Sequence, residues 1–397
     1  MFVHVDATDD RDTAAALARL TGSLSEARAS APDFLAVYAS AAHASAAVRA
    51  AAAATGARAV HGGTSCLGVM ARGRMMADGG AGIGFFALWD ADGVFGTGLA
   101  ELGSDPRNAA RQAAIAALEA AGRQGEAPEL VWLTAAPGAE EAIIAGIEDV
   151  VGPGTPILGG SAADNDLSGS WAVFDRESVA GSGVAVSVLF PSGPLASAYQ
   201  SGYVPTATSG IATRVEGRRV AEIDGRPARE VYSGWTGGAV GADTVPGPSP
   251  ILSESTFHPL GRHIGDVAGV PFYLLAHPAT AHDDGSIDLF ADVEPGERLT
   301  LMTGSAESVV RRAGRVAGLA ARQGGLEGRG IAGALVIFCG GCMLAVRERM
   351  DEVAAEVDGA LGGAPSLGIF TFGEQGSVLG ERNRHGNLMI SCVAFPG

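Results

Sequence analysis

The sequence contains no lysine, since all 27 basic residues among its 397 are arginines. This absence excludes a Schiff base with pyridoxal phosphate or a carbonyl substrate, and the lysines that P-loop and kinase-type sites place on nucleotide phosphates. Positive charge is also outnumbered by 44 acidic residues, which gives a net charge of -17. Nucleic acids and anionic membranes bind clustered positive charge, so we expect neither as a partner.

Cysteine is scarce as well, and four cysteines in a chain of this length do not predict a disulfide framework. Cys339 and Cys342 form a C-x-x-C pair, a pattern that occurs in zinc sites and in redox dithiols. No second C-x-x-C accompanies it, and the His258 to His263 segment contains proline and glycine. We therefore expect no metal and no cofactor, while a redox role and a packing role for the pair stay open.

Long hydrophobic runs are absent too. The uncharged apolar stretch at residues 330–346 is short for a membrane span and has a glycine pair near its middle. The N-terminus is acidic at once, without the basic and apolar regions of a signal peptide. The composition, 47% hydrophobic and 18% charged, is that of a globular protein. We expect a cytoplasmic location.

The chain does contain a repeat of pattern. Three segments, residues 11–60, 106–158 and 305–372, each read as helix, strand, helix, strand, and each is closed later by an apolar strand at 82–89, 183–190 or 388–395. A β-rich stretch with a Pro-, Gly- and Ser-rich loop at 243–253 precedes the third copy. The predicted fold is α/β and α+β, with two domains, 1–204 and 205–397, built on mixed β-sheets flanked by helices.

Polar loops follow the second strand of each copy, at the sheet edge where open α/β proteins bind ligands. None of these loops has a dinucleotide-binding or P-loop spacing. We expect a small polar ligand there, and the candidate ligand-binding residues are Thr64, Ser65, Ser161, Asp164, Asn165, Cys342, Glu374, Gln375, His385 and Asn387. Two alternatives stay open: that Asp164 only holds its own loop in an Asx turn, and that the Glu374 loop is a solvated hairpin.

The motifs GGTSCLGVM, ILGGSAADN, EIDGRPARE, FHPLGR, VEPGERLTLM, CGGCMLAV and FTFGEQG with HGNLM occur in this order. Their succession resembles the FIST family, with its N-terminal FIST domain followed by its C-terminal FIST domain, from about residue 14 to 395. The resemblance implies an intracellular sensory module of signal transduction, best known from bacteria and from eukaryotic F-box proteins, that binds small molecules such as amino acids. The family's characteristic residues map to Gly63, Thr64, Ser65, Gly160, Ser161, Asp164, Asn165, Cys342, Gly373, Glu374, His385 and Asn387.

Three functions follow as hypotheses. In the first, a sensor, Glu374 pairs with the amino group of an amino acid, His385 and Asn387 hold its carboxylate, and a signalling partner protein reads the bound state. In the second, a hydrolase or transferase, Cys342 or Cys66 is the nucleophile and His385 the base. In the third, a protein-binding scaffold, the glycine-rich loops are structural turns.

Overall fold

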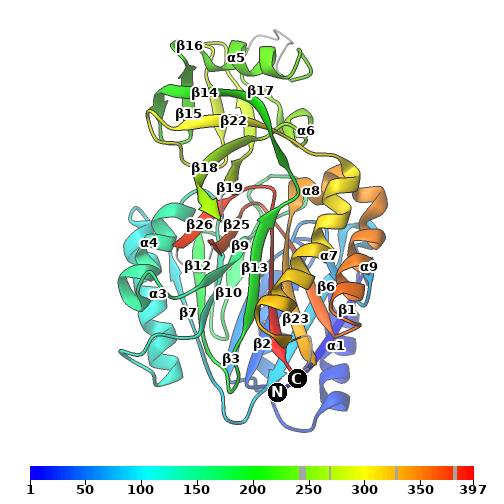
Figure 1. Ribbon diagram of the computed structural model, residues 1–397. Coiled ribbons are helices and arrows are strands. Elements are labelled where there is room, and N and C mark those ends of the chain that lie inside the picture. Colours follow the sequence, from blue (N-terminus) through cyan, green and yellow to red (C-terminus); the bar gives the residue numbers. More distant parts are fainter. Residues whose placement is uncertain (241–246, 268–269, 327–329, 379–381) are drawn as a thin grey trace.

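The computed structural model describes residues 1–240, 247–267, 270–326, 330–378 and 382–397. Most of the described chain forms a body of three α/β units, with an antiparallel insert standing over one end of it (Figure 1). Both termini lie at the far end of the body from the insert (Figure 1). None of the described helices is long and apolar enough to cross a membrane.

Each unit repeats one order of elements, as the sequence pattern predicts. The first unit contains β1 (Phe2–Thr8), α1 (Thr13–Ala27), β2 (Phe34–Ala39), α2 (Ser45–Ala54), β3 (Ala59–Thr64) and β6 (Ile83–Trp89). The second contains β7 (Val94–Glu101), α3 (Pro106–Ala121), β8 (Leu130–Ala135), α4 (Glu140–Val151), β9 (Ile157–Ser161) and β12 (Gly183–Phe190). The third contains β13 (Ala196–Ser201), α7 (Ala306–Gln323), β23 (Ile331–Cys339), α8 (Gly340–Ala345), α9 (Met350–Ala360), β24 (Ser366–Thr371) and β27 (Met389–Pro396). The strand orders are β1-β6-β2-β3, β7-β12-β8-β9 and β13-β27-β23-β24, so the three sheets are equivalent.

Local signals explain where the helices begin and end. In α3 the Asp105 side chain accepts the backbone N–H of Asn108, Pro106 stands at the first turn, and Gly122 ends the helix in the left-handed conformation. In α7 the side chains of Ser305 and Ser308 each accept the other residue's backbone N–H. The second helix predicted within residues 305–372 is interrupted, because α8 ends at Ala345 and α9 starts at Met350.

The inner faces of the three sheets share one hydrophobic core. Phe86 of the first unit, Trp132 of the second and Phe395 of the third are fully buried in it, and the Phe86 and Phe395 ring centroids lie 5.2 Å apart. The helices cover the outer faces, where α1 and α2, α3 and α4, and α7 and α9 each bury an apolar side on their own sheet. Burying a Phe or Trp side chain contributes roughly 1.5–3 kcal/mol, so the shared core binds the units to one another.

The units also exchange hairpins in a closed ring. The hairpin of β4 (Val69–Ala71) and β5 (Arg74–Met76) leaves the first unit and pairs with β24 of the third. The hairpin of β25 (Glu374–Val378) and β26 (Arg382–Gly386) leaves the third unit and pairs with β9 of the second. The hairpin of β10 (Val173–Phe174) and β11 (Val179–Ala180) leaves the second and pairs with β3 of the first. The β4–β5 and β25–β26 hairpins pair with strands on the other side of the predicted domain boundary at 204/205. The division of the chain into two domains stays a prediction.

The insert spans residues 204–303 and interrupts the third unit between β13 and α7. Its strands are β14 (Val204–Glu216), β15 (Arg219–Ile223), β16 (Arg226–Pro227), β17 (Ser249–Pro250), β18 (Leu260–Val267), β19 (Val270–Ala276), β20 (Pro278–Ala281), β21 (Ile287–Leu289) and β22 (Arg298–Thr303), and its helices are α5 (Ala228–Trp235) and α6 (Leu252–Ser255). The sequence predicts a β-rich insert, which is confirmed. The loop predicted for 243–253 is wrong in its second part, which holds β17 and the start of α6, and residues 243–246 lie outside the described residues.

Candidate functional site

A cavity of about 430 Å³ lies where the three units meet the insert. The first unit contributes Cys66, the second the start of α4 and the loop after β9, and the third the ends of β23 and β24. The insert contributes residues from four separate segments. The cavity walls consist of Cys66, Pro137, Gly138, Glu140, Asn165, Asp166, Leu167, Trp171, Arg218, Leu252, His277, Phe290, Cys339, Gly341, Leu344, Phe372 and Asn387. The polar loops of all three units therefore do converge on one site.

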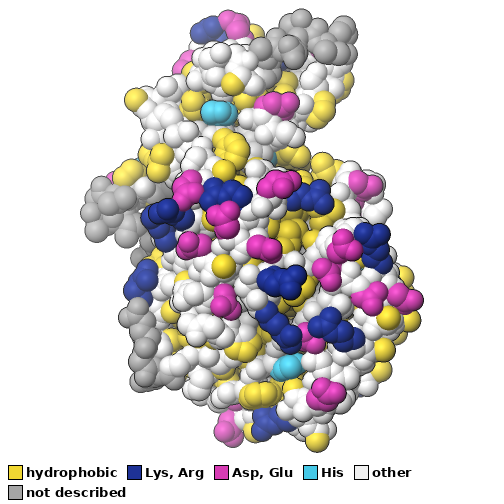
Figure 2. Space-filling model, turned by 90° about the vertical axis from the view of Figure 1, so that its right-hand side faces the viewer, with side chains coloured by type: hydrophobic (Ala, Val, Ile, Leu, Met, Phe, Trp, Pro, Cys, Tyr) yellow, Lys and Arg dark blue, Asp and Glu magenta, His cyan; other side chains and the backbone are white. Residues whose placement is uncertain are grey.

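Apolar and aromatic side chains form much of the wall. The rings of Trp171 and Phe372 meet edge to face with their centroids 6.3 Å apart. Leu167 and Leu344 stand at the rim and are 55% and 47% exposed, which is high for leucine. Figure 2 shows apolar side chains that reach the surface below the insert, among arginine and carboxylate side chains. Such walls fit a ligand with an apolar body.

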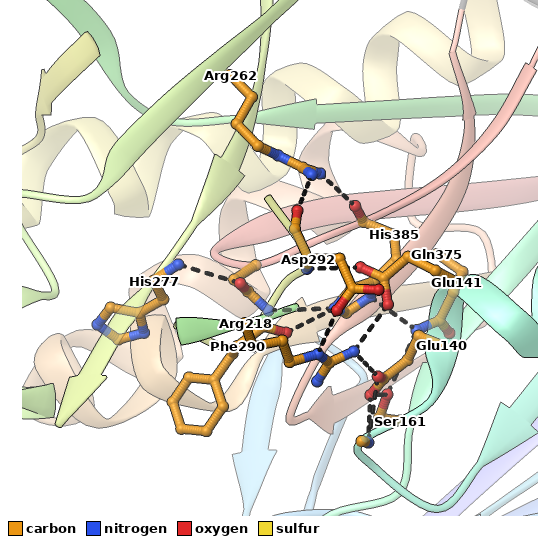
Figure 3. Close-up of polar contacts among 12 residues, drawn as sticks. Glu140, Glu141, Ser161, Arg218, Arg262, His277, Phe290, Asp292, Gln375 and His385 are labelled. Carbon is orange, nitrogen blue, oxygen red and sulfur yellow. Dashed lines mark hydrogen bonds and ion pairs between the residues drawn. The ribbon is translucent and has the colours of Figure 1, made fainter. Parts of the chain in front are cut away.

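An ion-pair cluster joins the insert to the body beside the cavity. The guanidinium of Arg218, between β14 and β15, contacts Glu140 at 2.6 Å, Glu141 at 2.8 Å and Asp292 at 3.2 Å (Figure 3). Glu140 and Glu141 belong to the first turn of α4, where acidic side chains are favoured by the helix dipole. The sequence analysis does not select these residues, although an adjacent acidic pair before a helix is a visible signal.

Glu140 is ionised despite complete burial. Burial alone would raise its pKa, but interactions with His385 and Arg218 and a hydrogen bond from Ser161 outweigh it and lower the pKa to about 2. The Ser161 hydroxyl donates to Oε1 at 2.6 Å, and the backbone N–H of Gly138 also donates to this carboxylate. Among the described residues, none accepts a hydrogen bond from Nη1 of Arg218. This nitrogen is therefore free to donate to a ligand.

Three further polar residues belong to the cavity wall: Asn165 and Asn387, which the sequence analysis predicts, and His277, which it does not. Asn165 ties two loops together, because its Oδ1 accepts the N–H of Leu67 at 2.7 Å and its Nδ2 donates to the carbonyl of Gly80 at 3.0 Å. Asn387 Oδ1 accepts the backbone N–H of His277 at 3.0 Å. Burial lowers the pKa of His277 to about 4, so its imidazole is neutral at pH 7.

Ser161, Gln375 and His385 form a layer behind the wall. The amide nitrogen of Gln375 lies 3.3 Å from the Ser161 hydroxyl and 3.3 Å from Nδ1 of His385. Nε2 of His385 lies 3.1 Å from the carbonyl oxygen of Phe290, which is a wall residue of the insert (Figure 3). The three residues thus position wall groups, and Figure 3 shows them grouped around the Arg218 cluster.

Thr64, Ser65 and Asp164 lie outside the cavity wall and hold the backbone. Thr64 exchanges hydrogen bonds with the backbone of Ala172, and the Ser65 hydroxyl accepts the N–H of Phe370 at 2.9 Å. The Asp164 carboxylate accepts the N–H groups of Leu167, Gly169 and Ser170, at 2.7, 2.7 and 2.8 Å. Asp164 therefore shapes the loop that forms the rim, which is the Asx-turn alternative.

Glu374, expected to anchor an amino group, is fully buried and is not part of the wall. Thr371 donates to its Oε1 and the backbone N–H of Met389 to its Oε2, both at 2.9 Å. Burial and the neighbouring Cys339 raise the pKa of Glu374 well above its ordinary 4.5. Its burial disfavours the charged form that the predicted ion pair with an ammonium group requires, and its position outside the wall keeps it from a ligand in the cavity.

Replacing Glu374 by glutamine is expected to stabilise the protein more as the pH rises. Because the folded-state pKa of Glu374 is raised, the contribution of this residue to the free energy of unfolding is fully present below pH 4.5. As the pH rises from 4.5 to the folded-state pKa, the free energy of unfolding falls by up to about 1.4 kcal/mol per pH unit. Glutamine keeps a neutral side chain of the same shape and lacks this loss. Urea unfolding from pH 4 to 9 measures the difference, and an equal stability of both proteins at every pH would contradict the assignment.

The thiols do not form the predicted nucleophile and base pair. Cys66 and Cys339 line the cavity, whereas Cys342 lies behind it with its sulfur 3.6 Å from the Tyr203 hydroxyl. In the part of the chain that is described, no hydrogen bond joins His385 to Cys66 or Cys342. Burial, with Asp164 and Cys339 nearby, raises the pKa of Cys66 to about 12, so this thiol is not activated. The described residues also contain no metal-binding cluster.

The described chain thus has the architecture of three equivalent α/β units with an insert over one end and a cavity between the insert and the units. Two family matches agree with it: the FIST N domain over residues 33–226 and the FIST C domain over residues 228–377. The chain belongs to the FIST family, whose domains act in sensing and signalling.

Other comparisons add little. No curated protein matches the chain significantly. Among solved structures, cyanuric acid hydrolase from A. caulinodans is 12% identical with a TM-score of 0.40 and 99% of each chain covered. PurLQS from Thermotoga maritima is 9% identical with a TM-score of 0.22, covering 76% of this chain and 72% of the other. Likenesses this weak carry no argument about fold or function.

Proposed function

We propose that this protein is a cytoplasmic sensor that binds a small molecule in the cavity between the body and the insert. The observation that carries the proposal is the convergence of loops from all three units and the insert on one cavity of about 430 Å³. This volume is within the usual range of small-molecule sites. A scaffold without a ligand would need no such space, because polar loops used only as turns pack against each other or face water.

The ligand is an amino acid or a similar small molecule with an apolar body. Its apolar part would lie against Trp171, Phe290 and Phe372, and its polar end would face Arg218 and Asn387. Nη1 of Arg218 would donate to a carboxylate or carbonyl oxygen. The carboxylates around Arg218 outnumber its single charge, which disfavours a ligand with net negative charge and favours one that also carries an amino group.

Ligand binding would be read out as a change in how the insert sits on the body. The two parts are joined by the Arg218 cluster and by His277 and Phe290, which bond to Asn387 and His385 of the body. A ligand that contacts wall groups of both parts binds the closed arrangement better than an open one and so increases its population. A partner protein that recognises the closed arrangement would then receive the signal.

A thermal-shift screen with blocked variants tests the proposal. A ligand at about a hundred times its dissociation constant should stabilise the wild-type protein by roughly 2.7 kcal/mol, which is visible as a higher melting temperature. Gly341→Leu should abolish the shift, because a side chain at this wall position extends toward His277 and Cys339 and fills the cavity. The panel should contain apolar and aromatic amino acids, their amines, their carboxylic acids and their amides.

Gly359→Leu is the matched control, because Gly359 is also helical and nothing lies within 4 Å of its potential Cβ. It should retain the full ligand shift, measured against its own ligand-free melting temperature. The proposal fails if no compound shifts the wild type, or if Gly341→Leu responds as strongly as Gly359→Leu.

A further inference from the structure

The C-x-x-C pair lies at the back of the cavity and is not used by the proposed sensor. Cys339 ends β23 and is part of the wall, whereas Cys342 is buried behind it in α8. Cys339 is the N-cap of α8 and Cys342 is the third residue of that helix, so the two thiols start one helical turn apart. All four cysteines of the chain are free thiols. The pair is therefore reduced, and of its two thiols the cavity wall includes that of Cys339.

Glycine at position 341 keeps the approach to Cys339 open. A Cβ on Gly341 would lie 3.6 Å from the Cys339 sulfur and 3.5 Å from Cε1 of His277. Any larger side chain at this position would fill the space between the thiol and the imidazole. Because Gly341, Cys339 and His277 all belong to the wall, this space is continuous with the cavity.

Cys342 has the position of a second, resolving thiol. It follows Cys339 by three residues, and on a helical turn residues at this spacing lie on the same side. A disulfide needs Cβ atoms about 3.5–4.5 Å apart, a distance that small local movements of the intervening Gly340 and Gly341 can provide. The Tyr203 hydroxyl lies 3.6 Å from the Cys342 sulfur.

We propose that Cys339 and Cys342 form a redox site that is oxidised by a low-molecular-weight disulfide entering the cavity. The Cys339 thiol loses its proton to solvent, and its sulfur attacks one sulfur of the small disulfide; that S–S bond breaks and one thiol leaves. The Cys342 sulfur, after losing its own proton, then attacks the mixed disulfide and releases the second thiol. In sum, two protein thiols become one disulfide and the small disulfide becomes two thiols. Burial disfavours the Cys339 thiolate, so the exchange is slow at neutral pH.

Tyr203 couples the oxidation state of Cys339 and Cys342 to the two chain segments that connect the body with the insert. This residue stands between β13 and β14, where the chain first enters the insert. Its ring packs against Gly304, where the chain returns, since a Cβ on Gly304 would lie 2.5 Å from the ring. Drawing the Cys342 sulfur toward Cys339 removes its contact with the Tyr203 hydroxyl and so affects both connections.

Bis(2-hydroxyethyl) disulfide, which is small and uncharged, serves as the probe on the purified full-length protein, without any other ligand. We expect the protein to lose two of its four free thiols, counted in denaturant with a chromogenic thiol reagent, and to yield a peptide in which Cys339 and Cys342 are disulfide-linked. Reduction should restore all four. The Cys342→Ser variant should stop at one hydroxyethylthio group attached to Cys339.

Cys392, fully buried in β27, should stay reduced and is the internal control, and Cys66→Ser is the matched variant that should still form the disulfide. Four thiols that survive prolonged exposure would overturn the proposal, as would a disulfide or a hydroxyethylthio group mapped to Cys66 or Cys392. Peptide mapping of the wild type decides the question even if a variant folds poorly. Because no sensor ligand takes part, a negative result here leaves the sensor proposal standing, and the reverse also holds.

Discussion

Glu140→Gln is expected to lower the free energy of unfolding at pH 7 by about 3 kcal/mol, because it leaves Arg218 without its most buried partner. The lowering of the Glu140 pKa from 4.5 to about 2 corresponds to this amount at roughly 1.4 kcal/mol per pKa unit. Ser161 and Gly138 also lose a charged acceptor. Since Arg218 joins the insert to the body, the variant should bind ligand more weakly as well.

The pH dependence of this loss has a definite sign. A carboxyl group with a lowered folded-state pKa contributes its full stability above pH 4.5, and the contribution disappears as the pH falls from 4.5 to about 2. The wild type and Glu140→Gln should therefore converge in stability near pH 2 and differ fully at pH 5 and above. Urea unfolding followed by circular dichroism at a series of pH values measures both effects.

Glu126→Gln provides the control, because Glu126 is about half exposed and forms an ion pair with Arg123 at 3.3 Å. An exposed pair contributes only about 0–1 kcal/mol. If Glu140→Gln is no less stable than Glu126→Gln at pH 7, or if the gap to the wild type persists at pH 2, the cluster does not hold the insert as described.

Gly159→Ala is expected to destabilise the protein by more than about 3 kcal/mol, to the point of poor soluble expression. A Cβ at this position of β9 would lie 1.9 Å from the backbone oxygen of Leu133 on the adjacent strand β8. Backbone cannot move out of the way as a flexible side chain can. Gly159 also pairs with Gln375 of the exchanged hairpin, so the variant disturbs the pairing of β25 with β9.

Gly154→Ala is the matched change, in the loop before β9, where nothing lies within 4 Å of the potential Cβ. It should change the free energy of unfolding by less than about 0.5 kcal/mol. Chemical unfolding of both variants and the soluble fraction after expression give the comparison. Equal stability of the two would mean that the strands at residue 159 are not packed as the structure shows them.

The close contacts at Gly159 also indicate the role of the two adjacent glycine pairs, Gly62–Gly63 and Gly159–Gly160. The sequence analysis names Gly63 and Gly160 only as characteristic residues of the family, and in the structure Gly62, Gly63, Gly159 and Gly160 all lie within β3 and β9. A Cβ on Gly62 would lie 2.0 Å from the ring of Phe174, which belongs to the hairpin received from the second unit. These glycines permit close approach of exchanged hairpins and neighbouring side chains, and the ligand cavity begins beyond them.

The sequence alone determined the three-unit organisation and the places where polar loops leave the sheets. Hydrophobic periodicity, caps such as Asp105 and Ser305, and glycine at helix ends are local signals, and they depend on residues only a few positions apart. The succession of motifs likewise indicated the FIST family and the sensory class of function. Asn165 and Asn387 were found as cavity residues because they follow strands that end at one edge.

Only the tertiary structure decided which polar residues face the cavity and in which charge state. Arg218 meets Glu140 from 78 positions away, and the Ser65 hydroxyl bonds Phe370 from 305 positions away, so no local pattern announces either contact. Glu374 reads as a ligand carboxylate in the sequence but is fully buried, and burial with Cys339 nearby raises its pKa well above 4.5. The hairpin exchange was equally hidden, since a strand's alternation of side chains does not identify the sheet edge with which it pairs.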